Sequence, residues 1–203
     1  SGMKQEEFME ENQEERIQEA DAVSAEKKAE KRAVVKKEII DWCKALLFYC
    51  VIPVLLFNYF FIIAYVPTGS MMPTVNPGDW TLAVRVRNPE TSIDRDNVVV
   101  FYSEELDKIL FKRCIGLPGE EVEVKKNGSV YIDGEKLEED YVSSDSRVSR
   151  DFEVPEGSYL FFGDNRGDSL DARYWDNPYI SGEDIMGRAI FIFWPLADFG
   201  VIQ

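Results

Sequence analysis

The sequence predicts a mainly β protein, with an antiparallel barrel-like or sandwich-like domain preceded by a single apolar helix. Short β-branched or aromatic runs recur along the C-terminal two thirds of the chain, and no amphipathic helical pattern separates them. Turn signals lie between the runs, and Asn127-Gly128 is a strong hairpin signal. An uncharged stretch at residues 45–66 precedes all of these runs.

Seven short runs are predicted as strands, at residues 80–86, 97–102, 108–115, 121–125, 129–132, 159–162 and 189–193. Their regular spacing is typical of an antiparallel barrel or sandwich. Residues 134–157 are acidic, polar and rich in serine, so we expect a looser insertion there.

The N-terminal part predicts delivery to a membrane. Residues 1–22 are strongly acidic with little apolar content, so we expect disorder. Residues 23–44 predict a basic, partly helical juxtamembrane arm. Residues 45–66 are long enough to cross about 30 Å of hydrocarbon as a helix, although a signal peptide or a core helix is the alternative. The positive-inside rule predicts a cytoplasmic arm and an extracytoplasmic domain over residues 67–203.

The composition excludes several classes of function. The formal net charge of −15 argues against nucleic acid as a partner, because phosphate binding needs clustered lysine and arginine. The chain has no histidine, which excludes Ser-His-Asp and Cys-His catalysis and histidine-ligated zinc. The three cysteines have neither metal-like nor disulfide-framework spacing. A hydrolase with this sequence would need a base other than histidine.

Ser70 lies at the junction between the apolar stretch and the β domain. Pro67 has a fixed φ, Gly69 permits a tight turn, and Pro73 prevents a helix from continuing. We therefore expect the Ser70 hydroxyl on a rigid, non-helical turn, where it could act as a nucleophile. The alternative is a simple linker that leaves the membrane helix.

Lys112 is the candidate base because it lies within an apolar predicted strand. Burial disfavours the charged amine and can bring a lysine pKa from roughly 10.4 toward neutrality. Alternation places Lys112 and Cys114 on one face of the strand and Phe111 and Arg113 on the other. The alternative is an ordinary edge-strand lysine that prevents aggregation.

The loop at residues 163–175 is the third candidate, because it concentrates carboxylates and arginines after an aromatic strand. Asp171 with Arg173, or Asp164 with Arg166, could form bidentate ion pairs that fix the loop. A Ca²⁺ site is the alternative, since four residues offer oxygen ligands: Asp164, Asn165, Asp168 and Asp171. The spacing lacks the EF-hand pattern, so we assign no metal ligand.

Taken together, these segments resemble the bacterial type I signal peptidases of the Gram-positive-like, prokaryotic Ser-Lys type. The resemblance covers residues 45–203 and is carried by four motifs in order: PTGSMMPT at 67–74, DNVVVF at 96–101, KRCIGLPG at 112–119, and the segment from GDNR to YW at 163–175. It implies a signal peptidase catalytic domain on one transmembrane helix. It also implies a membrane-bound serine endopeptidase that removes signal peptides from exported preproteins and needs no cofactor.

The resemblance implies a role for each site residue. Ser70 would be the nucleophile and Lys112 its base. The Ser70 amide and the Thr68 hydroxyl would form the oxyanion hole, and Ser169 would orient the Lys112 amine. The loop supports would be Asp164, Asp171 and Arg173. The residues lining shallow pockets for small substrate side chains would be Pro67, Met71, Val75 and Phe111. The substrate would add as a strand beside residues 64–66 and 108–111.

The expected partners are signal peptides of preproteins, the lipid bilayer and the secretion translocon, with no nucleic acid. Two other functions remain open from the sequence. One is a membrane-tethered, non-enzymatic interaction module. The other is a self-cleaving Ser-Lys peptidase of the repressor type.

Overall fold

The computed structural model describes residues 27–28, 30–144 and 148–202. The acidic segment predicted at residues 1–22 lies outside the described residues, as does the start of the basic arm. The chain divides into two units, residues 1–56 and residues 57–203.

One helix, Glu30–Phe60, is long and apolar enough to cross a membrane, with a mean hydropathy of 2.0 over its most apolar window. It contains a π-helical turn, Leu47–Val51, and ends in α2, Ile52–Phe60. The π turn lies just before Pro53, which has no N–H to donate and whose ring would crowd the carbonyl of Tyr49. A wider turn relieves this conflict, and the Ile52 N–H donates to Leu47 O.

The helix ends six residues earlier than the sequence suggested. Residues 61–66 were expected to be helical, but Phe61–Tyr65 form strand β1, which pairs with β2. Two arginines cap the last turn, because Arg85 Nε donates to Asn58 O at 2.8 Å and Arg87 Nη2 donates to Tyr59 O at 2.9 Å. The apolar span therefore lies closer to the N-terminus than predicted.

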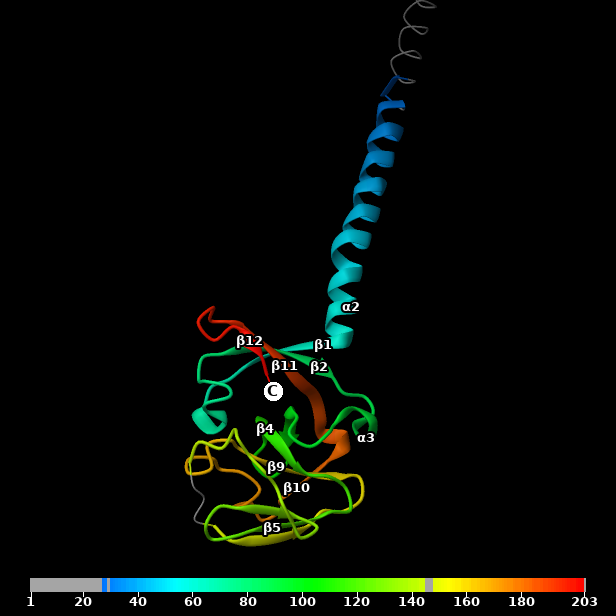
Figure 1. The fold of residues 1–203 in the computed structure, drawn as a ribbon. Coiled ribbons are helices and arrows are strands. Elements are labelled where there is room, and N and C mark those ends of the chain that lie inside the picture. Colours follow the sequence, from blue (N-terminus) through cyan, green and yellow to red (C-terminus); the bar gives the residue numbers. More distant parts are fainter. Residues whose placement is uncertain (1–26, 29, 145–147, 203) are drawn as a thin grey trace, which may run out of the picture. The chain divides into compact units, whose positions relative to one another are not determined.

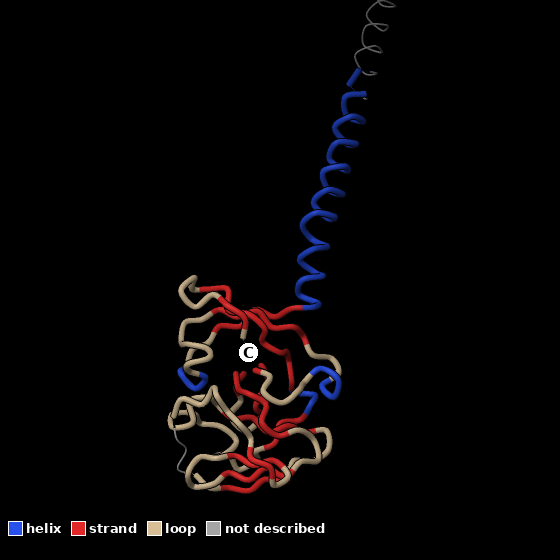
Figure 2. The backbone as a smooth tube through the Cα atoms, viewed as in Figure 1, coloured by secondary structure: helices blue, strands red, loops and turns tan. Residues whose placement is uncertain are grey.

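The unit from residue 57 onward is built from two antiparallel sheets (Figures 1 and 2). The larger sheet has the order β1-β2-β11-β3-β4-β9-β10, with β12 paired to β11. The smaller sheet has the order β7-β6-β5-β8. Its strand β5 lies at the opposite end of this unit from β1 and β2 (Figure 1). The predicted fold class, mainly β and antiparallel, is confirmed.

The larger sheet comprises β1 Phe61–Tyr65, β2 Trp80–Arg85, β3 Val98–Ser103, β4 Lys108–Gly116, β9 Ser158–Phe162, β10 Tyr179–Ser181, β11 Ile185–Trp194 and β12 Gly200–Val201. The smaller sheet comprises β5 Glu121–Val124, β6 Val130–Ile132, β7 Glu135–Lys136 and β8 Arg150–Glu153. The short helical elements are η2 Gly69–Met71, α3 Pro89–Ser92 and η3 Gly182–Asp184.

All seven predicted strands are present, and five further strands among the described residues were not predicted: β1, β7, β8, β10 and β12. The last four have four residues or fewer and little hydrophobic alternation, and β1, with five residues, was hidden inside an apolar run. The expected loose insertion at 134–157 is partly wrong, because it contains β7 and β8. Strand β8 buries Phe152 against the smaller sheet, and this long-range packing gives no periodic signal.

Strand β3 separates two hydrophobic clusters and is buried on both faces. Val99 and Phe101 belong to the cluster that joins the two sheets, whereas Val98 and Val100 belong to a second cluster with Met71. The turn that carries Ser70 is thus packed directly against the centre of the larger sheet.

Candidate active site

Ser70 lies in η2, a single 3-10 turn, and its side chain is buried at 8% exposure. The sequence predicted a turn with no helical character, whereas the structure forms one short helical turn. Backbone hydrogen bonds anchor this region on both sides: Val66 N donates to Asp79 O at 2.9 Å, and Gly78 N donates to Val66 O at 2.8 Å. The hydroxyl is therefore held on a restrained backbone.

Lys112 lies in β4 opposite Val99 of β3, and only 4% of the residue is exposed. Its Nζ lies 2.5 Å from Ser70 Oγ. The alternative of an ordinary lysine that prevents aggregation at a strand edge is therefore wrong, because the side chain is buried and not exposed to solvent. The two residues are 42 positions apart in the chain, and the packing of η2 on the sheet brings them together.

The Lys112 amine has a strongly lowered pKa. Burial, which disfavours the charged form, lowers this pKa from 10.5 to about 8. The charges of Asp171 and Asp164 oppose the shift, while that of Arg173 adds to it. Desolvation outweighs the nearby carboxylates, so the neutral amine is a minor species at pH 7 and about half of the population at pH 8.

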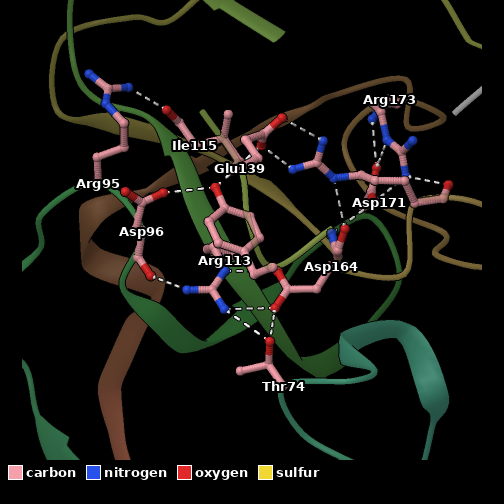
Figure 3. Close-up of polar contacts among 12 residues, drawn as sticks. Thr74, Arg95, Asp96, Arg113, Ile115, Glu139, Asp164, Asp171 and Arg173 are labelled. Carbon is pink, nitrogen blue, oxygen red and sulfur yellow. Dashed lines mark hydrogen bonds and ion pairs between the residues drawn. The ribbon is translucent and has the colours of Figure 1, made fainter. Parts of the chain in front are cut away.

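A buried ion pair between Arg113 and Asp164 lies next to this pair (Figure 3). The contact is bidentate, with Arg113 Nε and Nη2 at 2.8 Å and 2.7 Å from the two carboxylate oxygens. Thr74 Oγ1 donates to the same carboxylate at 2.5 Å, and the guanidinium lies 3.9 Å from the centre of the Tyr141 ring. Arg113 was not among the predicted site residues. Its only sequence signal is its place in the strand beside Lys112.

The predicted ion pair between Asp171 and Arg173 is confirmed (Figure 3). Both contacts are 2.8 Å, and Asp171 also accepts from the Gly163 N–H at 2.9 Å. The alternative pair between Asp164 and Arg166 is wrong. The Arg166 side chain instead pairs with Glu139, because Asp164 is already occupied by the arginine of β4.

The Ca²⁺ alternative for this loop receives no support. Within residues 27–28, 30–144 and 148–202, no group of three or more histidine, cysteine, aspartate or glutamate residues is arranged to hold a metal ion. Two of the four proposed ligands, Asp164 and Asp171, are instead neutralised by arginines.

The loop after β9 also contacts the nucleophile turn directly. Asn165 N donates to Ser70 O at 3.0 Å, and Asn165 Nδ2 donates to Gly69 O at 3.2 Å. A methyl group added at Gly163 would come within 2.5 Å of Ser70 O, so this glycine permits the close approach. From the sequence, Asn165 was considered only as a possible metal ligand. Its hydrogen bonds to the turn that carries Ser70 were not predicted.

The expected hydrogen bond from Ser169 to Lys112 is not formed. Ser169 Oγ is buried and has no hydrogen-bond partner within the described part of the chain. Ser169 Oγ and Ser70 O both lie next to Gly163. Ser169 is therefore close to the turn that carries the nucleophile. Thr68, the other predicted hydroxyl donor, is exposed at the start of η2 and makes no side-chain capping bond there.

The four predicted pocket residues lie around the nucleophile turn but differ in exposure. Met71 and Val75 are fully buried, Phe111 is half-buried against the same hydrophobic cluster, and Pro67 is exposed. Of these four residues, only Phe111 and Pro67 are accessible to solvent.

Two strands near the site have unpaired edges. Among the described strands, β1 pairs only with β2, so its other edge is open. Strand β9 covers β4 only at Arg113, Cys114 and Gly116. The segment 108–112 is therefore paired with β3 alone. Such edges are suited to β-strand addition by an extended peptide.

A buried serine in contact with a lysine of lowered pKa, on an antiparallel β scaffold, is the arrangement that a serine hydrolase with a lysine base requires. The model of one family, "Signal peptidase, peptidase S26", matches residues 39–194. The chain therefore belongs to this family, and it is an enzyme of the signal peptidase I type.

Two relatives that are similar in sequence agree with this assignment. The chain is 36% identical to "Probable signal peptidase I-2" of Synechocystis over 68% of this chain and 65% of that protein. It is 32% identical to "Signal peptidase IB" of Staphylococcus aureus over 81% of this chain and 94% of that protein. A crystal structure of a signal peptidase I from Enterococcus faecalis matches 48% of this chain and 96% of its own at 33% identity, with a TM-score of 0.41.

Proposed function

We propose that this enzyme removes signal peptides from exported preproteins with Ser70 as the nucleophile and Lys112 as its general base. The observation that carries the proposal is the 2.5 Å contact between Lys112 Nζ and Ser70 Oγ, formed by an amine whose pKa is lowered to about 8. A neutral amine at this position can accept the serine proton near physiological pH.

The reaction follows from this geometry. Ser70 Oγ attacks the scissile carbonyl while its proton passes to the neutral Lys112 amine, and a tetrahedral oxyanion forms. The protonated amine then gives the proton to the scissile nitrogen, which departs as the N-terminus of the mature protein and leaves the signal peptide as an ester on Ser70. Water, deprotonated by the same amine, attacks the ester, and the signal peptide leaves with a free carboxylate while Ser70 Oγ regains its proton from the amine.

The oxyanion would be stabilised by the Ser70 N–H and the Thr68 hydroxyl. The exposed position of Thr68, with no side-chain capping bond, leaves its hydroxyl available to a substrate. One such donor contributes about 10²- to 10³-fold to kcat in other serine peptidases.

Ser169 would hold the Lys112 amine when substrate is bound. Its buried, unpartnered hydroxyl supports this role, because buried polar groups rarely remain without a partner. The ion-paired residues Asp164, Asp171 and Arg173 would fix the loop that carries it.

An extended substrate would bind between the open edges of β1 and β4. Pro67 and Phe111 would contact the small side chains that precede the cleavage site, and the buried Met71 and Val75 would limit the depth of these pockets. Small residues at the −1 and −3 positions would fit such shallow sites.

The membrane orientation and the partners are also part of the proposal. The basic residues before the apolar helix support a cytoplasmic N-terminus, a bilayer anchor and an extracytoplasmic peptidase unit that acts beside the secretion translocon. Trypsin added to intact spheroplasts is expected to degrade the unit after residue 60 and to spare the basic arm. Degradation of the arm with protection of the other unit would reverse the orientation.

The detergent-solubilised protein is expected to cleave a peptide that spans an Ala-X-Ala signal sequence site, directly after the second alanine. A matched peptide with phenylalanine in place of that alanine is the control, and it should remain intact because the pockets are shallow. Mass spectrometry of the products identifies the cleaved bond. No cleavage of the Ala-X-Ala peptide would favour a tethered, non-enzymatic module instead.

A further inference from the structure

Asn165 holds the two carbonyl groups on either side of the Ser70 amide. Its N–H donates to Ser70 O at 3.0 Å, and its side-chain Nδ2 donates to Gly69 O at 3.2 Å. The peptide bond between Gly69 and Ser70 is trans, so its C=O and N–H point in opposite directions. The side chain that fixes the Gly69 carbonyl therefore also fixes the direction of the Ser70 N–H.

This restraint matters because the peptide unit follows a glycine. Glycine tolerates backbone angles that would let the unit rotate and turn the N–H away from the substrate. Within the described part of the chain, the only other hydrogen bond to Gly69 O is the 3.2 Å bond from Met72 N that closes the 3-10 turn, and such turns have poor hydrogen-bond geometry. An oxyanion donor is effective only when it is already aimed at the developing charge.

Ser144 sets the orientation of the Asn165 amide. Ser144 Oγ accepts from the Gly167 N–H at 2.7 Å and lies 2.8 Å from Asn165 Oδ1. Because a backbone N–H can only donate, the single hydroxyl proton of Ser144 remains for Asn165 Oδ1. The amide oxygen thus faces Ser144, and the amide NH₂ faces Gly69 O. The three hydrogen bonds form a chain in which each bond polarises the next.

We propose that Asn165 is a positioning residue that aims the Ser70 N–H at the oxyanion, and that Ser144, from the 134–157 insertion, holds Asn165 in the orientation this requires. The inference deepens the proposed function and rests on it. It also gives the insertion a role in catalysis, because one of its side chains acts through the loop after β9 on the nucleophile turn.

The main test is Asn165→Asp, which keeps the shape of the side chain but removes the donor to Gly69 O. We expect kcat for the Ala-X-Ala peptide to fall about 10- to 100-fold and KM to stay within about twofold of the parent value. This loss in kcat is smaller than the loss caused by removing an oxyanion donor, because the Ser70 N–H is misdirected and not removed. The matched control is Asn88→Asp, because Asn88 makes no side-chain capping bond before α3. This control should keep the parent kcat.

A second variant, Ser144→Ala, leaves Asn165 in place but frees its amide to rotate. The expected loss in kcat is about 3- to 10-fold, as for one neutral hydrogen bond. This variant decides the question alone if Asn165→Asp does not fold, which thermal unfolding of both proteins will show.

Two readouts separate positioning from general damage. A peptide aldehyde adds reversibly to Ser70 and places its oxygen in the oxyanion hole, so its affinity should fall in proportion to kcat. In Ser144→Ala, which adds no charge, the pH midpoint of activity, which is set by Lys112, should stay at the parent value. A kcat within twofold of the parent in the folded variants, or a lower kcat with unchanged aldehyde affinity, would overturn this inference alone. No cleavage by the parent would overturn the proposed function and this inference together.

Discussion

Replacing Ser70 by alanine is expected to lower kcat/KM for the Ala-X-Ala peptide by about 10⁶-fold, as the loss of a serine nucleophile does in other peptidases. The reason is geometric. Ser70 Oγ is the hydroxyl in contact with the lysine amine, at 2.5 Å, and alanine cannot form the acyl-enzyme. The measurement is single-turnover cleavage with excess enzyme, so that very slow rates can be resolved.

Ser149→Ala is the matched control for this variant, because Ser149 is an exposed serine. It should retain the parent rate. Thermal unfolding should show that Ser70→Ala keeps its fold, since the lost hydroxyl leaves the packing of Met71 and Val75 unchanged. Activity of Ser70→Ala within tenfold of the parent would contradict the assignment of the nucleophile.

Replacing Lys112 by methionine is expected to remove activity to a similar extent, because no other base among the described residues contacts Ser70 Oγ. In the parent enzyme, kcat/KM should rise with pH through a midpoint near 8, where the buried amine loses its proton. Lys126→Met is the control, since Lys126 is exposed and lies in the turn between β5 and β6, outside the larger sheet. Retained activity in Lys112→Met, or a midpoint near 10.5 in the parent, would exclude the lysine as the base.

The free energy of unfolding should rise with pH, as the activity does, because the same buried amine loses its proton. The folded pKa of Lys112 is about 8 and its ordinary value is 10.5, so between these values the unfolded chain binds more protons than the folded one. The free energy of unfolding of the parent should therefore rise with pH across this window, by about 3 kcal/mol at most. Below pH 8 the buried charge destabilises the fold. Lys112→Met should lack this rise and be no less stable than the parent at pH 7, as denaturant unfolding can measure.

Local patterns were sufficient for much of the fold. Alternation and turn residues predicted the described strands that have an apolar run of their own, and the uncharged stretch predicted the helix. The position of the helix end was wrong because residues 61–65 are as apolar as the helix that precedes them. Their strand conformation depends on pairing with β2, and the helix end depends on Arg85 and Arg87, which are more than 20 residues away.

Only some residues of the candidate site could be predicted, because the others depend on partners that are far away in the sequence. Ser70, Lys112 and the pair of Asp171 with Arg173 were identified from motifs in which each residue is chemically unusual for its surroundings. Arg113 was not identified, because an arginine in a strand does not indicate a site until its carboxylate partner is known. That partner, Asp164, lies 51 residues later in the chain. Ion-pair choice in the loop was ambiguous, since two arginines and several carboxylates offered more than one combination.

The sequence by itself determined the chemistry that is available: a serine on a restrained turn, a lysine in an apolar strand, no histidine, and one apolar helix. Composition and periodicity fix these features because they depend on each residue and its near neighbours. Only the tertiary structure decided that the Lys112 amine reaches Ser70 Oγ, that Asp164 pairs with Arg113, and that Asn165 and Ser144 reach the nucleophile turn. Contacts of this kind join segments far apart in the chain, and they follow from the packing of loops on the two sheets rather than from any local preference.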